Sequence, residues 1–438
     1  MNIQTNSKKI KKGDTFIALG NGHKYIEDAI SSGATKVVVE KGRFDVETII
    51  VPDTREYLIN HLKNNYYKQI KDINIIGITG TNGKTTTAYL IYQALNIAGL
   101  KCAYIGTIGF YIEEKIRDLD NTTPDILEIY EMILEAKEKG CTHIVMEVSS
   151  HSLDIGRVDA LKFDYVIFTN LTSEHLDYHK TMDNYFNAKK KIFKLLKDTG
   201  ISIINNDDNY VNTINIENKI TVGFSESDYK IGNFIFDSNT IFELNDKEYV
   251  MKLLGKYNIY NMSFTIALLK EMKISDISSI VSRLDPPVGR MQIITYGTNK
   301  IIVDYAHTKD AVLNIINGVK EFNKRNIITI VGCGGNRDKT KRPEIAKTAT
   351  TLSDYVIITS DNPRFEDPMD IINDMTKGLT NTNYQVIVNR KEAIEKGIQL
   401  LNDNDILLIL GKGHEKYQII NDEKIYFDDV ETVITYMN

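Results

Sequence analysis

Short apolar runs recur along the chain and alternate with longer stretches whose apolar residues fall at helical spacing. The runs are rich in β-branched residues and have no polar face, which is typical of strands buried on both sides. The expected strands are INIIGIT (73–79), HIVMEV (143–148), YVIFTN (165–170), IITIVG (ending at Gly332), YVIITS (355–360) and DILLILG (405–411). The expected helices include 84–98, 125–139 and 308–323. This alternation predicts an α/β fold with largely parallel sheets.

The length and the breaks in the pattern predict three domains. A chain of 438 residues is too long for one ordinary hydrophobic core. Residues 1–71 form a small α/β unit, and residues 72–296 begin with the first long apolar strand. Residues 297–438 begin with a fresh strand after the loop that contains Pro286 and Pro287, the clearest break in the chain.

Composition narrows the classes of partner. Apolar residues make up 42% of the chain and charged residues 26%, as in soluble globular proteins. The net charge of −6 and the lack of a basic face argue against nucleic acid. No apolar stretch approaches the roughly 18 residues of a membrane span, and the basic N-terminus lacks the apolar core of a signal peptide. The three cysteines fit buried free thiols, so we expect a cytoplasmic protein.

The strongest local signal is the segment Gly80-Thr81-Asn82-Gly83-Lys84-Thr85-Thr86, which follows an expected strand and opens an expected helix. Glycines let backbone N–H groups turn toward phosphate oxygens, and the helix N-terminus adds positive potential. The lysine would reach the outer phosphates and the first threonine a Mg²⁺ ion. Ile78 stands where the strict phosphate-loop pattern has glycine, and a tight strand-to-helix connection is the alternative.

Two further strand ends carry groups that could bind a metal. Glu147 ends one expected strand, where carboxylates of a parallel sheet face the ligand crevice, although an ordinary strand-end charge would look the same. His175 and His179 lie four residues apart, which would suit one helix face, but no zinc motif accompanies them and a structural pair is the simpler interpretation. The nearby lysines are expected on a solvated helix face: Lys190, Lys194 and Lys197.

Taken in order, the motifs of this chain resemble the Mur ligase family over essentially its whole length. They are GTNGKTT, NTTPD, MEVSSHSLDIGRVDALKFD, FTNLTSEHLDYHKTMDNYFNAKK, GKYNIYN, VGRMQ, VDYAHTKDA, VGCGGNRDKTKRPEIA, SDNPRFEDP and GKGHEKYQ. The resemblance implies an N-terminal domain for a UDP-sugar, a central ATP-binding domain and a Rossmann-like C-terminal domain for an amino acid. These three expected domains match the segments inferred from the apolar pattern.

The resemblance also implies the residues that bind ATP and Mg²⁺. The nucleotide would be bound by the loop Gly80–Thr86 and by Asn258, Asn261 and Asp304. Arg290 would neutralise phosphate charge and act with Lys84 in catalysis. Thr85, Glu147, His175 and Lys189 would surround Mg²⁺, the last as a carbamate, because a carbamate turns a cationic lysine into an anion. Without the resemblance, both asparagines could be helix caps.

By the same resemblance, one set of residues would hold the UDP-linked substrate. Its members are Ser7, Asn121, Thr122, Thr123, Ser149 and Arg157. Arg157 offers a planar fork for a carboxylate or a phosphate. Ile155 stands where the family often has glutamine, and the chain begins close to its first motif, so the sugar and uracil contacts are the least defined of the set.

The C-terminal motifs indicate which amino acid is added. They resemble the diaminopimelate-adding branch, in which the implied substrate contacts are Arg337, Asp361, Asn362, Pro363, Arg364, Gly411 and Glu415. Meso-diaminopimelate has a distal carboxylate that Arg364 can bind bidentately, whereas lysine would place an ammonium there. A sulfur-bridged analogue would fit equally. The alternative for Arg364 is a turn arginine paired with Glu366 or Asp367.

The implied reaction is an ATP-dependent, ADP-forming amide ligation in peptidoglycan precursor synthesis. The amino acid would join the D-glutamate γ-carboxylate of UDP-N-acetylmuramoyl-L-alanyl-D-glutamate through an acyl phosphate. We expect a monomer. The alternatives are a lysine-adding ligase of the same family, a folylpolyglutamate or cyanophycin synthetase, and a nucleotide-binding protein without catalysis.

Overall fold

The computed structural model describes residues 2–237, 239–322 and 325–437 and divides into two compact units. The first comprises Met1–Thr79, Gly99–Val166 and Asn187–Ser202, and the second comprises Gly80–Ala98, Ile167–Phe186 and Ile203–Asn438. The predicted boundary after residue 71 lies inside the first unit and the one after residue 296 inside the second. The division into three domains therefore stays a prediction.

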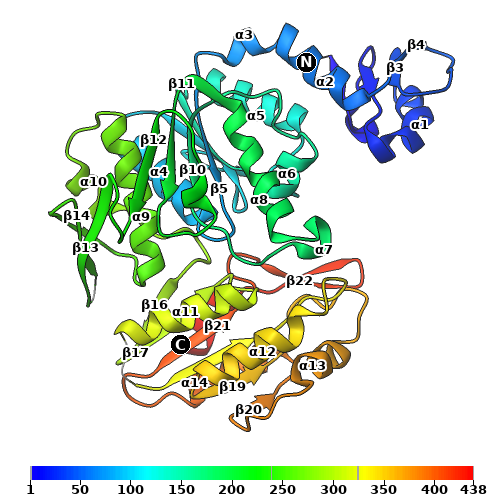
Figure 1. Cartoon of the computed structure of the whole chain (residues 1–438). Helices are drawn as coiled ribbons and strands as arrows, with labels where there is room; N and C mark the ends of the chain where they lie inside the picture. The colour runs from blue at the N-terminus through cyan, green and yellow to red at the C-terminus, as the bar shows by residue number, and fades with distance from the viewer. Residues whose placement is uncertain (1, 238, 323–324, 438) are drawn as a thin grey trace. The chain divides into compact units, whose positions relative to one another are not determined.

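The N-terminal part of the first unit is a four-stranded parallel sheet with the order β1-β2-β3-β4. Its strands are β1 (Ile3–Gln4), β2 (Thr15–Ile17), β3 (Lys36–Val39) and β4 (Glu47–Ile50). The helices of this part are α1 (Ile26–Ser31), α2 (Thr54–Asn65) and α3 (Tyr67–Ile70), drawn in blue in Figure 1. Asp53 starts α2 by accepting from two backbone N–H groups, as an N-cap should.

The rest of the first unit surrounds the strand that precedes the phosphate loop. Strands β5, β9 and β6 are parallel neighbours, and β7 and β8 continue the sheet in antiparallel fashion. They are β5 (Asn74–Thr79), β6 (Cys102–Gly106), β7 (Gly109–Ile112), β8 (Glu114–Arg117) and β9 (His143–Glu147). Helices α5 (Ile126–Glu138) and α6 (Ser150–Asp154) accompany them. Ile126, Ile129 and Ile133 put the apolar face of α5 into the core.

Three elements contain residues of both units: β10 (Phe163–Phe168), α8 (Met182–Lys190) and β11 (Leu196–Asn205). The second unit contains helices α4 (Lys84–Ile97), α7 (Leu176–His179), α9 (Lys256–Glu271) and α10 (Ile277–Arg283). Its strands β12 (Lys219–Gly223), β13 (Tyr229–Phe236), β14 (Thr240–Leu244) and β15 (Lys247–Met251) are neighbours in that order. The last three form an antiparallel meander that the apolar runs did not predict.

The C-terminal part of the second unit is a six-stranded sheet with the order β16-β17-β21-β18-β19-β20. All of its pairings are parallel except that of the edge strand β16. The strands are β16 (Gln292–Tyr296), β17 (Asn299–Asp304), β18 (Ile327–Val331), β19 (Tyr355–Ile358), β20 (Tyr384–Val386) and β21 (Ile406–Leu410). The helices are α11 (Lys309–Phe322), α12 (Lys341–Leu352), α13 (Pro368–Thr376), α14 (Arg390–Gln399) and α15 (Asp429–Met437). A hairpin of β22 (Tyr417–Ile420) and β23 (Glu423–Tyr426) completes it.

Alternate residues of the central strand β21 face two separate cores. Leu408 and Leu410 pack in the core that contains residues of α11, α12 and α13, while Leu407 and Ile409 pack in the core that contains residues of α14. Figure 1 shows these helices along the sheet. Because successive side chains of a strand point to opposite faces, a strand covered on both sides must be apolar throughout. This explains the unbroken run DILLILG.

The fold class predicted from the sequence is confirmed: the molecule is α/β and its main sheets are largely parallel. Each expected strand appears within about two residues of its predicted ends, as do the three expected helices. The cysteines Cys102, Cys141 and Cys333 are free and buried, as expected. Within the described parts of the chain, no helix has the length and apolar character needed to cross a membrane.

Candidate functional site

The phosphate loop needs glycine at two positions for steric reasons. Gly80 has φ 144° and Gly83 has φ 84°, both in the region that side chains disfavour. A Cβ on Gly80 would lie 1.9 Å from Thr169 Oγ1, and one on Gly83 would lie 2.5 Å from Asn261 Oδ1. The loop is thus pressed against its neighbours at both ends, so neither glycine can gain a side chain without moving the loop.

Residues at the end of β10 clamp the phosphate loop. Asn170 Oδ1 accepts from the Asn82 N–H at 2.8 Å, and its Nδ2 donates to the Asn82 carbonyl at 3.1 Å. Thr169 Oγ1 donates to the same carbonyl at 2.6 Å. Thr81 Oγ1 lies 3.1 Å from the Tyr185 hydroxyl. The sequence analysis quoted FTNLTSEH as a motif but gave Thr169 and Asn170 no role.

Lys84 lies over the loop at the first position of α4. Its Nζ donates to the carbonyls of Gly80 and Thr81 at 2.9 and 2.7 Å. An ammonium group beside the N-terminus of a 14-residue helix makes a strongly positive local potential. The loop is therefore suited to a polyphosphate, as its sequence predicts.

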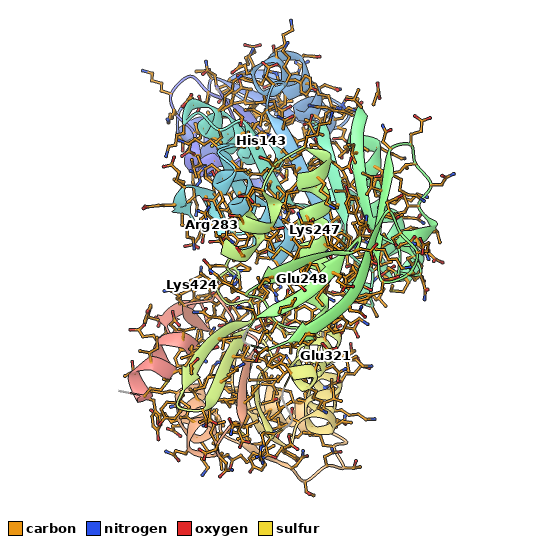
Figure 2. All side chains as sticks on the ribbon, turned by 90° about the vertical axis from the view of Figure 1, so that its left-hand side faces the viewer. His143, Lys247, Glu248, Arg283, Glu321 and Lys424 are labelled. Carbon is orange, nitrogen blue, oxygen red and sulfur yellow. The ribbon has the colours of Figure 1, made fainter. Side chains whose placement is uncertain are left out.

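A cavity of about 410 Å³ opens beside the loop within the second unit. Its size is ordinary for a small-molecule site. The predicted nucleotide-binding and catalytic residues among its walls are Asn82, Gly83, Thr86, Asn258, Asn261, Arg290 and Asp304. Other parts of the wall, such as Phe264 and Glu321 on α11 (Figure 2), lie outside the motifs noted in the sequence. The structure thus brings residues from distant segments to one cavity.

The two predicted asparagines are internal to α9 and are not caps. The N-cap of this helix is Gly255, and both asparagines are buried. Asn261 Nδ2 donates to Asn258 Oδ1 at 2.9 Å, while Asn261 Oδ1 accepts from the Thr87 hydroxyl at 3.2 Å. They connect α9 to α4 and leave the helix-cap alternative without support.

Arg290 reaches the phosphate loop from the segment before β16. Its Nη2 lies 3.5 Å from Thr85 Oγ1, and its guanidinium stacks 4.7 Å above the Tyr305 ring. Asp304 orders the adjoining backbone by accepting from the Met291 N–H at 2.8 Å. Burial raises the pKa of Asp304, and nearby Arg290 partly offsets that effect. An arginine in this place can neutralise charge at the loop.

Glu147 is buried in the first unit, where hydrogen bonds hold its carboxylate. Tyr104 Oη donates to Oε1 at 2.5 Å, and the Thr107 N–H donates to the same oxygen at 2.8 Å. The Thr107 hydroxyl donates to Oε2 at 3.1 Å. A Cβ on Gly106 would lie 2.3 Å from Oε1. This carboxylate is held in one orientation, unlike an ordinary strand-end charge.

Most of the residues predicted to hold the UDP-linked substrate gather next to Glu147. Thr123 Oγ1 donates to the Glu147 carbonyl at 2.9 Å and accepts from the Ser149 N–H at 3.0 Å. Arg157 Nη1 donates to the Thr123 carbonyl at 3.0 Å. Thr122 Oγ1 lies 3.1 Å from the Thr107 hydroxyl, with Asn121 just before it in the chain.

Ser7 belongs to a different part of the first unit, where it begins a short 3₁₀ helix (Ser7–Lys9) near the N-terminal sheet. The contacts predicted for Ser7 and for this cluster remain predictions.

Lys189 differs from the lysines around it by its burial. Its exposed fraction is 1%, whereas Lys190 and Lys194 are exposed. A fully buried lysine is rare because desolvation disfavours the ammonium. His175, in contrast, is exposed and has the left-handed φ of 57°.

His175 and His179 both lie near the ring of Tyr185. His179 is buried, and its ring lies 5.1 Å from the Tyr185 ring, which the His175 ring approaches to 6.1 Å. No cluster of three or more His, Cys, Asp or Glu side chains suited to a metal occurs among residues 2–237, 239–322 and 325–437. The predicted Mg²⁺ ligands are divided between the units: Glu147 and Lys189 in the first, Thr85 and His175 in the second. The oxygens of Thr85 and Glu147 suit Mg²⁺, and the joint role of the four residues stays a prediction.

The residues predicted to bind the amino acid follow the carboxyl ends of three neighbouring parallel strands. Arg337 follows β18, Asp361–Arg364 follow β19, and Gly411 and Glu415 follow β21. Loops after the carboxyl ends of parallel strands are where α/β proteins bind ligands. The topology thus gathers segments that lie far apart in the sequence.

Buried Asn362 and Lys412 and half-buried Glu415 form a polar group among these loops. Asn362 Nδ2 donates to Glu415 Oε2 at 2.7 Å, and Lys412 Nζ donates to Asn362 Oδ1 at 3.3 Å. Burial, and then the negative charge of Asp361, raise the pKa of Glu415, while Lys412 lowers it. Lys412 is fully buried. Its motif GKGHE was noted in the sequence, but its role was missed.

Arg364 is half-buried and held by backbone groups. Its Nη1 donates to the Gly335 carbonyl at 2.9 Å, and its own N–H donates to the Ile419 carbonyl of the β22–β23 hairpin at 2.9 Å. The carboxylates proposed as alternative partners are engaged elsewhere: Glu366 pairs with Arg342, and Asp367 caps α13. The guanidinium of Arg364 therefore contacts the loop after β18 through a backbone carbonyl, and its role in binding the amino acid stays a prediction.

Comparison with known proteins agrees with this arrangement. Residues 78–269 match the Mur ligase middle domain, and residues 289–413 match the Mur ligase glutamate ligase domain. A Clostridium botulinum protein named UDP-N-acetylmuramoyl-L-alanyl-D-glutamate–2,6-diaminopimelate ligase is 42% identical over 456 residues, which cover 98% of this chain and 94% of that protein.

Solved structures show the same fold. One is a UDP-N-acetylmuramoyl-L-alanyl-D-glutamate–2,6-diaminopimelate ligase, 30% identical with a TM-score of 0.69, covering 99% of this chain and 94% of that one. Another is the MurF ligase from Thermotoga maritima in complex with ADP. It is 16% identical with a TM-score of 0.68, and it covers 99% of this chain and 96% of that one.

Proposed function

Because the chain belongs to the Mur ligase family of ATP-dependent ligases, we propose that it joins meso-diaminopimelate to UDP-N-acetylmuramoyl-L-alanyl-D-glutamate. The bond formed is an amide with the γ-carboxylate of D-glutamate, and ATP is converted to ADP and phosphate. The observation that carries the proposal is that the loops bearing Arg337, Arg364 and Glu415 follow the carboxyl ends of three adjacent parallel strands. The relatives' names point to the same reaction.

The first step forms an acyl phosphate. An oxygen of the γ-carboxylate bonds to the γ-phosphorus as the bond to the β,γ-bridging oxygen breaks, and ADP leaves. Lys84 at the start of α4 and Arg290 beside Thr85 offset charge on the transferring group. Mg²⁺, held by Thr85, Glu147, His175 and a carbamate on Lys189, would supply further charge neutralisation.

The second step makes the amide. The α-amine of the amino acid attacks the acyl carbon, and the tetrahedral intermediate expels phosphate as the nitrogen loses a proton. Glu415 would accept from the distal ammonium of diaminopimelate, and Arg364 would bind the distal carboxylate through its planar fork. Lysine would present an ammonium near Arg364 without a carboxylate, so it should be disfavoured.

The proposal includes the division of labour among the three segments. Residues 1–71 would bind the UDP-sugar, residues 72–296 ATP, and residues 297–438 the amino acid. The separate sheets β1–β4 and β16–β21 support it. We propose a cytoplasmic monomer, since the nucleotide-linked substrate and ATP would be used in the cytoplasm and the described cysteines are free thiols.

The test is phosphate release by the purified protein with ATP, Mg²⁺ and UDP-N-acetylmuramoyl-L-alanyl-D-glutamate. Meso-diaminopimelate, its sulfur-bridged analogue and L-lysine are supplied in parallel, and the UDP-linked product is weighed by mass spectrometry. Strong turnover with diaminopimelate and little with lysine is expected. A preference for lysine would overturn the specificity, and no turnover with any of them would overturn the reaction.

The carbamate has its own test. Lys189 is buried whereas its neighbour Lys190 is exposed, and a carbamate formed at this buried position would need a bound metal ion to balance its charge. We expect Lys189→Ala to abolish activity, without recovery in high bicarbonate, because the variant has no amine to carbamylate. Lys190→Ala, at an exposed neighbouring position, is the control and should retain activity. Full activity of Lys189→Ala would remove the carbamate from the mechanism.

A further inference from the structure

Arg342 is among the largest fully buried side chains of the described residues. It lies on α12 and not in the loops after β18, β19 and β21, which are called the amino-acid loops below. Arg342 belongs to the first turn of α12 and forms ion pairs with the carboxylates of Glu366 and Asp374. Its Nη1 and Nη2 donate to the two oxygens of Glu366 at 3.0 and 2.9 Å, and Nη1 also donates to Asp374 at 2.7 Å. Such a two-point pair fixes orientation as well as distance.

The pair joins the two loops that carry Arg337 and Arg364. Arg342 Nη2 donates to the carbonyl of Gly334 at 3.3 Å, and Gly334 belongs to the loop after β18. Glu366 belongs to the loop after β19, and its Oε1 accepts from the Asn336 N–H of the first loop. In return, Asn336 Oδ1 accepts from the Phe365 N–H at 3.1 Å.

The two loops are in close contact where the pair holds them. The Gly335 N–H donates to the Asn362 carbonyl at 2.9 Å, and a Cβ on Gly335 would lie 1.9 Å from the Pro363 carbonyl oxygen. A Cβ on Gly334 would lie 2.9 Å from Arg364 Nη1. A small shift of either loop would therefore move the guanidinium of Arg364 relative to Arg337.

We infer that Arg342 and Glu366 are a positioning pair that sets the spacing of Arg337 and Arg364 and thereby the selectivity for an amino acid with two carboxylates. The inference rests on the proposed function. Neither residue touches the substrate in this scheme. Bidentate recognition of a carboxylate tolerates little misplacement, so the fixed spacing would separate diaminopimelate from lysine.

The ionic state of the pair suits a permanent structural role. Hydrogen bonds from Arg342, despite some opposing desolvation, lower the pKa of Glu366 to about 2. Arg342 stays charged at any working pH. Asp374 is more exposed than Glu366 and also forms an ion pair with Arg342. It lies on α13, outside both loops. It is therefore a matched control for loss of an ion pair with Arg342.

The experiment compares Glu366→Gln, Arg342→Lys and Asp374→Asn in the full chain with all three substrates. We expect Glu366→Gln and Arg342→Lys to raise KM for diaminopimelate about tenfold or more. The ratio of kcat/KM for diaminopimelate to kcat/KM for lysine should fall as well. The reason is that misplacing a recognition group by about 1 Å can lower the rate about 100-fold. KM for ATP and for the UDP-linked substrate should stay within about twofold of wild type, as should every KM of Asp374→Asn.

Three outcomes would overturn the inference: unchanged KM for diaminopimelate in Glu366→Gln, an equal rise in all three KM values, or the same rise in Asp374→Asn. If Arg342→Lys does not fold, Glu366→Gln carries the test, since Glu366 lies nearer the surface. Wild-type protein without turnover on diaminopimelate would instead overturn the proposed function. Thermal unfolding of each variant separates a global loss of stability from a change in selectivity.

Discussion

The phosphate loop and the amino-acid loops both follow parallel strands, but they are built in different ways. The phosphate loop is one continuous segment, Gly80–Thr86, whose two glycines are fixed by close neighbours. The predicted amino-acid site combines the loops after β18, β19 and β21, which are separate segments of the chain. A continuous loop can be recognised by its residue order, whereas a composite site depends on how its parts are held.

The largest effect is expected from Gly80→Ala. The added Cβ would meet Thr169 Oγ1 at 1.9 Å and force the loop to move, so kcat/KM for ATP should fall about 100-fold or more. Gly99→Ala is the control, because Gly99 also has positive φ (82°) but nothing lies within 4 Å of its Cβ. Steady-state kinetics with varied ATP measure both. Equal losses in the two variants would attribute the effect to backbone strain instead of the clash.

A smaller and more selective effect is expected from Arg364→Lys. Lysine keeps the charge but loses the planar fork, so kcat/KM for diaminopimelate should fall roughly 30-fold, as for loss of a charged hydrogen bond of about 2 kcal/mol. KM for ATP should not change. Arg283→Lys, at the exposed end of α10 (Figure 2), is the matched control. Retention of full selectivity in Arg364→Lys would remove Arg364 from substrate recognition.

The pH dependence of amino-acid binding should also separate the two regions. Burial and Asp361 raise the pKa of Glu415, so its carboxylate takes up a proton at a higher pH than an ordinary glutamate. Since the ionised form would bind the ammonium, KM for diaminopimelate should rise several-fold on acidification toward that pKa. KM for ATP, measured in the same buffers, serves as the reference. If Glu415→Gln shows the same pH profile, another group is responsible.

The smallest effect is expected from Lys339→Ala. Lys339 Nζ lies 3.1 Å from Glu366, but its side chain is 65% exposed, and exposed ion pairs contribute less than about 1 kcal/mol. KM values should stay within about twofold of wild type. A tenfold rise in KM for diaminopimelate would mean that the surface lysine, and not buried Arg342, holds the loop of Glu366.

Much of the fold was predictable because burial on both faces leaves a strong local signal. Strand β21 and helix α11 appear where the apolar pattern predicts them. The meander β13–β15 was not predicted, since its strands alternate exposed and buried residues and depend on pairing with one another. The hairpin β22–β23 was missed because none of its strand residues is buried, although it positions the backbone of Arg364.

The candidate site divides in a similar way. Lys84, Glu147 and Arg364 were named from motifs, and the structure gives each a defined set of partners. Arg342 and Lys412 were overlooked although both lie in quoted motifs. Their burial is decided by the packing of distant segments, so their types alone resemble surface cations.

The sequence by itself determined the fully buried strands of the parallel sheets, the phosphate loop and the order of the family's motifs, because these depend on side-chain periodicity and on the backbone freedom of a few glycines. Only the tertiary structure decided which loops meet. Contacts between the loops after β18 and β19 arise from strand order in the sheet and from the buried pair Arg342–Glu366. The local sequence does not determine which strands are neighbours or whether a charged side chain is buried, because both depend on residues far away in the chain.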